Sequence, residues 1–195
     1  MSESVTKNAA CAIMNGHYIG DSTDVPVPFS RAELYRAYRS GLFLFFIPHG
    51  SLGAYPSHLH AVLEERDFRY EQDTFRAEIP TKNEFVLAFP RLHVGTEGLP
   101  LREQQQEVHS RSILSPYEVA SMYGLFHSVY PERTFFSGQA RTEYEVGIAG
   151  THLHANPLTI IVSSRQPGTL KLGKGYTTQV SPELGVMTGV RRSVG

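Results

Sequence analysis

The amino-acid sequence predicts an α+β fold, with helices and strands mixed in the first two-thirds of the chain and short antiparallel strands in the last third. Two observations support this prediction. Segments with helix-capping residues begin at Ser30 and Ser115. After Phe135, short apolar runs are separated by Gly, Pro and Asn turns to the end of the chain. Strand and helix do not alternate regularly, which argues against a parallel α/β sheet.

The length of the chain indicates one domain. With 195 residues, a single domain can bury roughly 70% of the surface that the unfolded chain exposes. We therefore expect one compact unit over residues 1–195. A subdivision into a mixed part (13–94), a connection (95–112) and a helix with a β-rich part (113–195) is also consistent with the pattern.

The first predicted helix follows a polar beginning. The first dozen residues are polar and are expected to be loosely ordered. Turn signals at Asn15-Gly16 and Gly20-Asp21 flank a short strand. Ser30 and Glu33 then form a capping box, in which each side chain satisfies a free amide at the start of a helix. Gly41 can adopt the left-handed conformation that ends this helix.

The middle of the chain contains two apolar runs. Leu42 to Ile47 is typical of a strand buried on both faces, or of a helix that continues to Pro48. We favour the strand, because Gly41 precedes the run and Pro48-His49-Gly50 follows it. A short helix is expected from Ser57 to about Arg66, and the second apolar run spans Phe85 to Phe89.

The second capped helix follows a polar segment. Residues 95–112, which contain Gly95, Gly98 and Pro100, predict an exposed connection. Ser115 then acts as a cap with Glu118 as its partner, and the helix is expected to stop before Pro131. The strand-like runs of the last third are Tyr144–Ile148, Leu158–Ser163, Leu170–Leu172 and Leu184–Val190.

The charge balance limits the classes of binding partner, and the cysteine content indicates the cellular compartment of the protein. Lys and Arg number 18 against 19 Asp and Glu, so the chain as a whole does not attract nucleic-acid phosphates. Cys11 is the single cysteine, which excludes an intramolecular disulfide and indicates a reduced thiol in the cytoplasm. The longest apolar run, Leu42 to Ile47, is far shorter than the roughly 20 residues that span a membrane. We expect a soluble cytoplasmic protein.

Two His-Leu-His triplets are the sharpest chemical feature of the sequence. Residues two apart in a strand share a face, so two imidazoles placed in this way can bind one metal ion. Glu64 follows His60 by four residues, a spacing that resembles part of the first metal-binding motif of cupins, although the glycine framing differs. The candidate ligands of a divalent metal are His58, His60, Glu64, His152 and His154. The alternative is that these histidines are solvated or locally hydrogen-bonded.

Basic and aromatic residues of the β-rich part form a second candidate site. They are Arg141, Tyr144, Arg165, Lys174 and Tyr176. Guanidinium and ammonium groups would bind an anionic group, and the tyrosine rings would stack on a sugar or a base. The alternative is that these side chains only cover solvated strand faces and discourage edge pairing.

Several short motifs lie between residue 74 and the end of the chain. They are Pro80, Glu84–Leu87, Glu103–Gln105, Ser115–Val119, Arg141-Thr142, Leu184–Val186 and Arg192-Ser193. On these motifs the chain resembles a bacterial family of uncharacterised proteins. The closing segment also resembles the last strand of C-type-lectin-like domains, which are ligand-binding scaffolds, although the tryptophans usual there are absent. The resemblance implies no particular activity.

Three functions are consistent with the sequence. We favour a binding module whose C-terminal strands and loops hold a protein, a glycan or a small anionic ligand, because the sequence carries no catalytic signature. The first alternative is a metal-dependent enzyme that uses the paired histidines. The second is a structural or assembly protein that forms a homo-oligomer by pairing Leu42–Ile47 or Leu158–Val162 between subunits.

Overall fold

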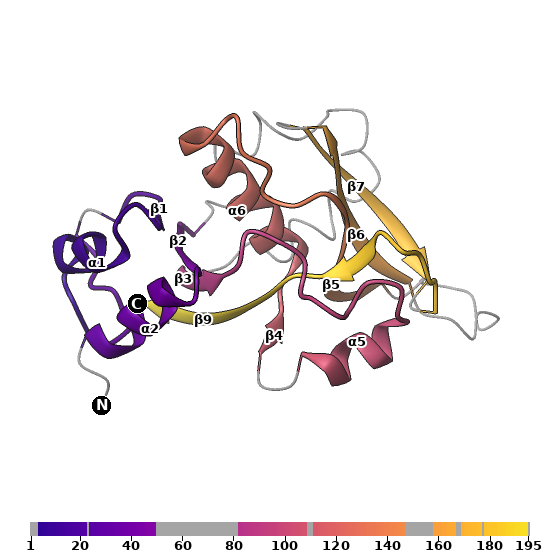
Figure 1. Ribbon diagram of the computed structural model, residues 1–195, viewed down its shortest axis with the longest axis horizontal. Helices are drawn as coiled ribbons and strands as arrows, with labels where there is room; N and C mark the ends of the chain where they lie inside the picture. Colours follow the sequence, from indigo (N-terminus) through magenta and orange to yellow (C-terminus); the bar gives the residue numbers. More distant parts are fainter. Residues whose placement is uncertain are drawn as a thin grey trace.

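The computed structural model describes residues 4–22, 24–49, 82–108, 111–146, 158–166, 169–176 and 178–194, and several residues of strands β5, β6 and β7 by their backbone only. Element labels follow Figure 1. The helices are α1 (Lys7–Met14), α2 (Arg31–Arg39), α5 (Leu101–Glu107) and α6 (Pro116–Val129). The strands are β1 (Tyr18–Ile19), β2 (Phe43–Ile47), β3 (Asn83–Ala88), β4 (Ser112–Ile113), β5 (Gly138–Val146), β6 (Leu158–Gln166), β7 (Thr169–Tyr176), β8 (Leu184–Val186) and β9 (Thr188–Val194).

The strands form two sheets, which confirms the α+β class. One sheet has the order β1-β2-β3-β9-β4 and the other the order β7-β6-β5-β8. Strands β5, β6 and β7 pair antiparallel, as predicted for the last third, whereas β8 pairs parallel with β5. Only Met187 separates β8 from β9, so one run of chain leaves the second sheet and enters the first (Figure 1).

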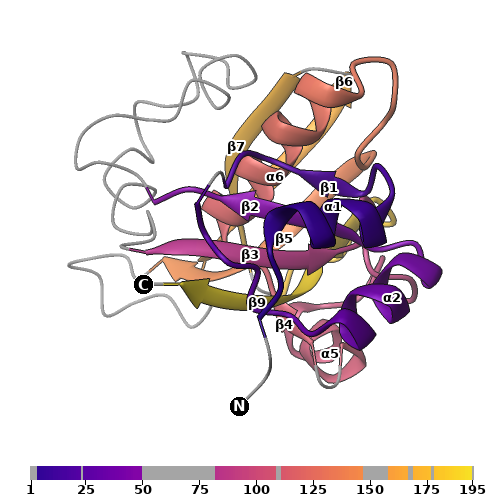
Figure 2. The same ribbon diagram turned by 90° about the vertical axis from the view of Figure 1, so that its left-hand side faces the viewer.

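Strand β2 of the first sheet is buried on both faces. In β2, Phe43, Phe45 and Ile47 pack in the cluster that contains α6, while Leu44 and Phe46 pack in the cluster that contains α1 and α2. Side chains that alternate between two apolar layers explain why this strand has no polar position. The strand prediction for this run is therefore confirmed. Figure 2 shows α1 and α2 on the same side of β2 and β3.

Helices α2 and α6 begin at the predicted caps. The Ser30 hydroxyl accepts a hydrogen bond from the Glu33 amide at 3.3 Å, and a Glu33 carboxylate oxygen accepts one from the Ser30 amide at 2.8 Å. Ser115 and Glu118 form the same pair of bonds at 3.2 Å and 2.6 Å. Gly41 has a φ of 78° after α2, and α6 ends before Pro131 as expected.

The beginning of the chain differs from its prediction. The first dozen residues were expected to be loose, and this is wrong for residues 7–12, which belong to α1. The Thr6 side chain caps the helix by accepting a bond from the Ala9 amide, and Asn15 closes it at a φ of 41°. Met14 and Ile13 are buried against β2 and α2 in the second core cluster. Burial of this short apolar stripe stabilises a helix whose local signal is weak.

Residues 95–112 also differ from a simple exposed connection. They contain α5, and both Thr96 and Gln104 are fully buried. Leu101 and Val108 pack with Ile113 and Val186 in a separate small cluster. The segment is a packed part of the fold, because its few apolar residues fall at helical spacing on one face.

Two further expectations concern a short helix in the middle of the chain and a membrane-spanning segment. The short helix expected from Ser57 to Arg66 lies outside the described residues. Among the helices that the structure describes, none is long and apolar enough to cross a membrane.

Candidate ligand-binding site

The segment between β3 and α5 runs along the edge of β8. We call residues 89–100 the crossing loop. The His93 amide donates to the Val186 carbonyl at 2.8 Å, and the Gly98 amide donates to the Leu184 carbonyl at 3.3 Å. Between them, the Thr96 hydroxyl accepts from the Val186 amide and donates to the His93 carbonyl. The loop therefore occupies the position of a strand on the side of β8 away from β5.

A hollow lies where the crossing loop faces the second sheet. Its volume is about 640 Å³. It is lined by Leu92, Glu97, Ser137, Gly138, Gln139, Ser164, Pro182 and Glu183. We call it the seam hollow, because its walls come from the crossing loop, the starts of β5 and β8, and β6. Four of these residues, from 137 to 139 and 164, lie in or beside the C-terminal strands.

The lining of the seam hollow is polar and acidic. Glu97 and Glu183 contribute two exposed carboxylates. Among the residues whose side chains the structure describes, no Lys, Arg or His belongs to the lining. Within the described part of the chain, neither carboxylate forms an ion pair. The hollow thus presents hydrogen-bond acceptors and a negative potential to whatever enters it.

Gly138 shapes one wall of this hollow. It has a φ of 98°, and a Cβ atom at this position would lie 2.7 Å from the Glu183 carbonyl oxygen. The neighbouring Gln139 amide donates to the same carbonyl at 2.8 Å. A glycine is required here both for the left-handed conformation and for the close approach of the two backbones. The start of β5 is therefore held against the Pro182-Glu183 turn.

Arg141 connects segments that form the walls of the seam hollow, and we call this residue and its partner Gln104 the Arg141–Gln104 brace. The Arg141 side chain is fully buried. The guanidinium donates to the Gln104 side chain at 2.7 Å, to the Gln179 carbonyl at 2.6 Å and to the Leu99 carbonyl at 3.3 Å. Burial lowers the pKa of Arg141 to about 10, so the group still carries its charge at neutral pH.

Gln104 extends this brace to β8. Its amide nitrogen donates to the Thr96 carbonyl at 2.8 Å and to the Leu184 carbonyl at 3.1 Å. Arg141 and Gln104 together connect β5, α5, the crossing loop and the segment before β8. Arg141 was predicted as part of an anion-binding face, but its buried side chain holds the protein's own carbonyls and does not reach the surface.

The other predicted ligand-binding residues are located by their backbones. Tyr144 lies in β5 and Arg165 in β6. Lys174 and Tyr176 lie in β7, opposite Ile160 and Leu158 of β6. Their side chains are outside the described part of the structure, so their convergence on one ligand stays a prediction.

The predicted metal ligands lie outside the described residues. His58, His60 and Glu64 fall within residues 50–81, and His152 and His154 fall within residues 147–157. In the described ranges, no group of three or more His, Cys, Asp or Glu side chains is placed to hold a metal ion. The divalent metal site therefore stays a prediction.

Sequence reasoning missed the residues that line the seam hollow. Glu97 lay in the segment interpreted as a connection, and Ser137 to Gln139 lay before the first expected strand of the last third. One local signal exists, because Gly138 begins β5 and the polar residues Gln139, Arg141 and Thr142 follow it. The meeting of these segments depends on contacts up to 90 positions apart, such as that of Thr96 with Val186.

Comparison with known proteins adds no relative: no protein-family model, no curated protein and no solved structure matches this chain.

Proposed function

We propose that this protein is a ligand-binding module that holds a small polyhydroxylated ligand, of the glycan class, in the seam hollow. The observation that carries the proposal is the lining itself, whose described residues combine hydrogen-bonding side chains from the C-terminal strands with two carboxylates and include no cation. Its volume of about 640 Å³ lies within the range of small-molecule sites.

The chemistry of the lining favours a glycan over an anion. Carboxylates accept hydrogen bonds from hydroxyl groups, and such charge-assisted bonds are stronger than neutral ones. Gln139 and Ser137 can both donate and accept, which suits a ligand that bears several hydroxyls. Leu92 and Pro182 offer apolar surface to the C–H groups of a sugar ring. A small anion would instead be repelled by Glu97 and Glu183.

The walls of the hollow are preorganised. The Arg141–Gln104 brace and the bonds of Thr96 to β8 hold the crossing loop against the second sheet. A site whose walls are fixed before binding loses less conformational entropy when the ligand enters. This supports a binding role more than an assembly role for the C-terminal strands.

The proposal places the protein in the cytoplasm. Its support is the cysteine usage of the sequence, in which Cys11 stands alone and cannot form an intramolecular disulfide. Fractionation of the producing cells with an antibody against the chain would test this location.

The test of the binding function uses saturation-transfer NMR with a panel of neutral mono- and disaccharides. We expect at least one of them to bind the wild-type protein. The double variant E97Q/E183Q should weaken that binding by about tenfold, because two charge-assisted acceptors are lost. Ser137→Trp should abolish it by filling the hollow.

The matched control is E132Q, which removes one exposed carboxylate that does not line the hollow. It should bind the same sugar with unchanged affinity. If no saccharide of the panel binds, or if E97Q/E183Q and S137W bind as the wild type does, the proposed function is wrong.

A further inference from the structure

A second hollow lies beside the first and has the opposite charge. Its volume is about 370 Å³, and its walls include Phe89, Arg91, His93, Glu107 and Arg111. We call it the arginine hollow. Leu92 lines both hollows, so they lie on either side of this residue. The arginine hollow is formed by the start of the crossing loop, the end of α5 and the residue before β4.

Two guanidinium groups in this hollow are oriented by one aromatic ring. The Cζ atom of Arg91 lies 4.9 Å from the centre of the Phe89 ring, and that of Arg111 lies 5.1 Å from it. Guanidinium groups at this distance are attracted by the electron-rich face of the ring. Both guanidinium groups are therefore attracted to the same ring, and both residues line the same hollow. Arg91 is exposed and Arg111 half-buried, so both can be reached from solvent.

These two arginines differ from the arginines that stabilise the fold. Arg192 pairs with Glu33 at 2.8 Å, and Arg191 pairs with the buried Glu118 at 3.3 Å. By contrast, no carboxylate of the described residues forms an ion pair with Arg91 or Arg111. Glu107 lines the same hollow but lies beyond ion-pair distance of both. Among the described residues that line the hollow, two arginines against one carboxylate give a net positive charge.

We propose that the arginine hollow is a binding site for an oxyanion with two negative charges, of the phosphate class. Each guanidinium presents a planar fork of donors that matches two oxygens of a phosphate or a carboxylate. A carboxylate has two oxygens and one charge, and one fork satisfies it. A phosphate or sulfate group has enough oxygens and charge for both forks at once. The pair of guanidiniums on one ring therefore selects the doubly charged anion.

This site is independent of the seam hollow. The acidic lining there would repel the anion that the arginine hollow attracts, and among the described residues the two linings share only the apolar Leu92. The sequence led us to expect an anion-binding face on the C-terminal strands, whereas Arg91 lies near the start of the crossing loop and Arg111 directly before β4.

The experiment is a titration of the ¹⁵N-labelled protein with inorganic phosphate, followed by NMR at constant ionic strength in slightly alkaline buffer. We expect saturable shifts of the Arg91 and Arg111 side-chain signals. R91A and R111A should each weaken the affinity by about tenfold, because each removes one charge-assisted fork. Sulfate should compete with phosphate, and acetate should bind at least about tenfold more weakly.

Two further variants make the result decisive. R102A removes an exposed arginine of α5 that does not line the hollow, and its affinity for phosphate should be unchanged. E107Q removes the opposing charge and should strengthen binding several-fold, a gain that misfolding cannot produce.

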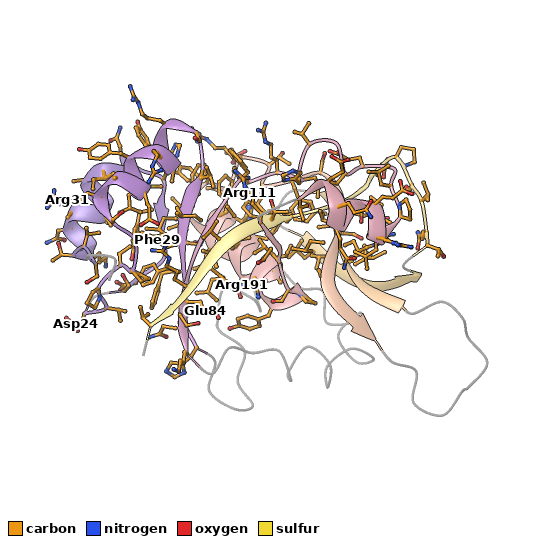
Figure 3. All side chains as sticks on the ribbon, turned by 90° about the horizontal axis from the view of Figure 1, so that it is seen from below. Asp24, Phe29, Arg31, Glu84, Arg111 and Arg191 are labelled. Carbon is orange, nitrogen blue, oxygen red and sulfur yellow. The ribbon has the colours of Figure 1, made fainter. Side chains whose placement is uncertain are left out.

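The proposal is overturned if R91A and R111A bind phosphate as R102A does, or if phosphate causes no larger shifts than chloride. An acetate affinity equal to that of phosphate would contradict the preference for a doubly charged anion. Figure 3 labels Arg111 and shows it, in that view, on the other side of the yellow strand β9 from Arg191 and Glu84.

Discussion

Single charged side chains connect segments of this protein that are far apart in the sequence. Arg192, near the end of the chain, pairs with Glu33 at 2.8 Å and lies over the Phe29 ring at 4.5 Å. Glu33 also accepts bonds from the amide and hydroxyl of Ser30. One carboxylate thus caps α2 and fastens β9 to it. The same carboxylate therefore serves local and tertiary structure.

The pKa of Glu33 makes this contact sensitive to acid. The Ser30 amide, followed by Arg192 and the Ser30 hydroxyl, lowers the pKa of Glu33 from 4.5 to about 2. A lowered carboxylate pKa stabilises the fold fully above the unfolded pKa, and this contribution is lost as pH falls from about 4.5 to about 2. E33Q should lower the free energy of unfolding by about 1 kcal/mol at neutral pH, a modest value because the pair is partly exposed.

The measurement is urea unfolding of wild type and E33Q, followed by circular dichroism across this pH range. The difference between them should stay constant above pH 4.5 and shrink below it. E132Q, at an exposed carboxylate, should show no such difference. A wild-type advantage that persists unchanged at the acid end would contradict the role given to Glu33.

The buried Glu118 shows the same dual use at the start of α6. Its carboxylate caps the helix through the Ser115 amide and faces Arg191 at 3.3 Å. Burial raises the pKa of Glu118, and the charge of Arg191 opposes that rise. The capping partner could be recognised from the sequence, because it depends on a spacing of three residues. Its partner on β9 could not, because that contact depends on the fold.

At the scale of elements, helix starts were predictable where a capping box marks them. Both α2 and α6 begin at a Ser followed three residues later by Glu. Helix α1 and helix α5 lack this box, and both were missed. Pro100 precedes α5 and makes no side-chain cap bond, and α1 has no acidic residue in its first turn. These helices depend on burial of a few apolar residues rather than on a capping box.

Removal of the α6 cap measures how much a capping residue contributes to the free energy of unfolding. In S115A the Glu118 amide loses its acceptor, so the free energy of unfolding should fall by about 1 kcal/mol. Thermal and urea unfolding followed by circular dichroism would measure this. S128A is the control in the same helix, since Ser128 is exposed and donates only to the Leu125 carbonyl; it should change stability by less than about 0.5 kcal/mol. Equal effects of the two substitutions would contradict the assignment.

At the scale of the whole molecule, the β8–β9 run joins the two sheets. β8 pairs with β5 in one sheet, and β9 pairs with β3 and β4 in the other. Helix α6 packs in a single apolar cluster with residues of both sheets, among them Phe45 of β2 and Val162 of β6. The crossing loop and the Arg141–Gln104 brace add polar contacts at the same junction. The two hollows lie where these connections converge.

Close packing at this junction predicts a strong effect of one added methyl group. At Gly189 a Cβ atom would lie 2.9 Å from a Val86 methyl and 3.1 Å from both Leu114 and the Leu87 carbonyl. G189A should therefore lower the free energy of unfolding by about 1–3 kcal/mol through overpacking. The measurement is urea unfolding followed by circular dichroism.

Gly173 provides the matched control for this substitution. It is also a strand glycine, in β7, but a Cβ there would meet nothing within 4 Å. G173A should leave stability within about 0.5 kcal/mol of the wild type. A G189A variant as stable as G173A would show that the junction can relax around the methyl group.

The candidate sites were less predictable than the fold. The sequence indicated that the C-terminal strands hold polar residues, but it placed Arg141 on a surface that the structure buries. Glu97, Glu183, Arg91 and Arg111 could not be grouped, because their positions along the chain do not indicate which of them meet. Residue spacing indicates neighbours only within one helix or strand.

The sequence by itself determined the class of the fold, the capped starts of α2 and α6, and the buried strand β2. These follow from capping chemistry and from apolar runs, which act over a few residues. Only the tertiary structure decided which sheet receives β9, that the crossing loop lies beside β8, and that two hollows of opposite charge share Leu92. Those outcomes depend on contacts between distant segments, whose energy arises only when the segments pack together.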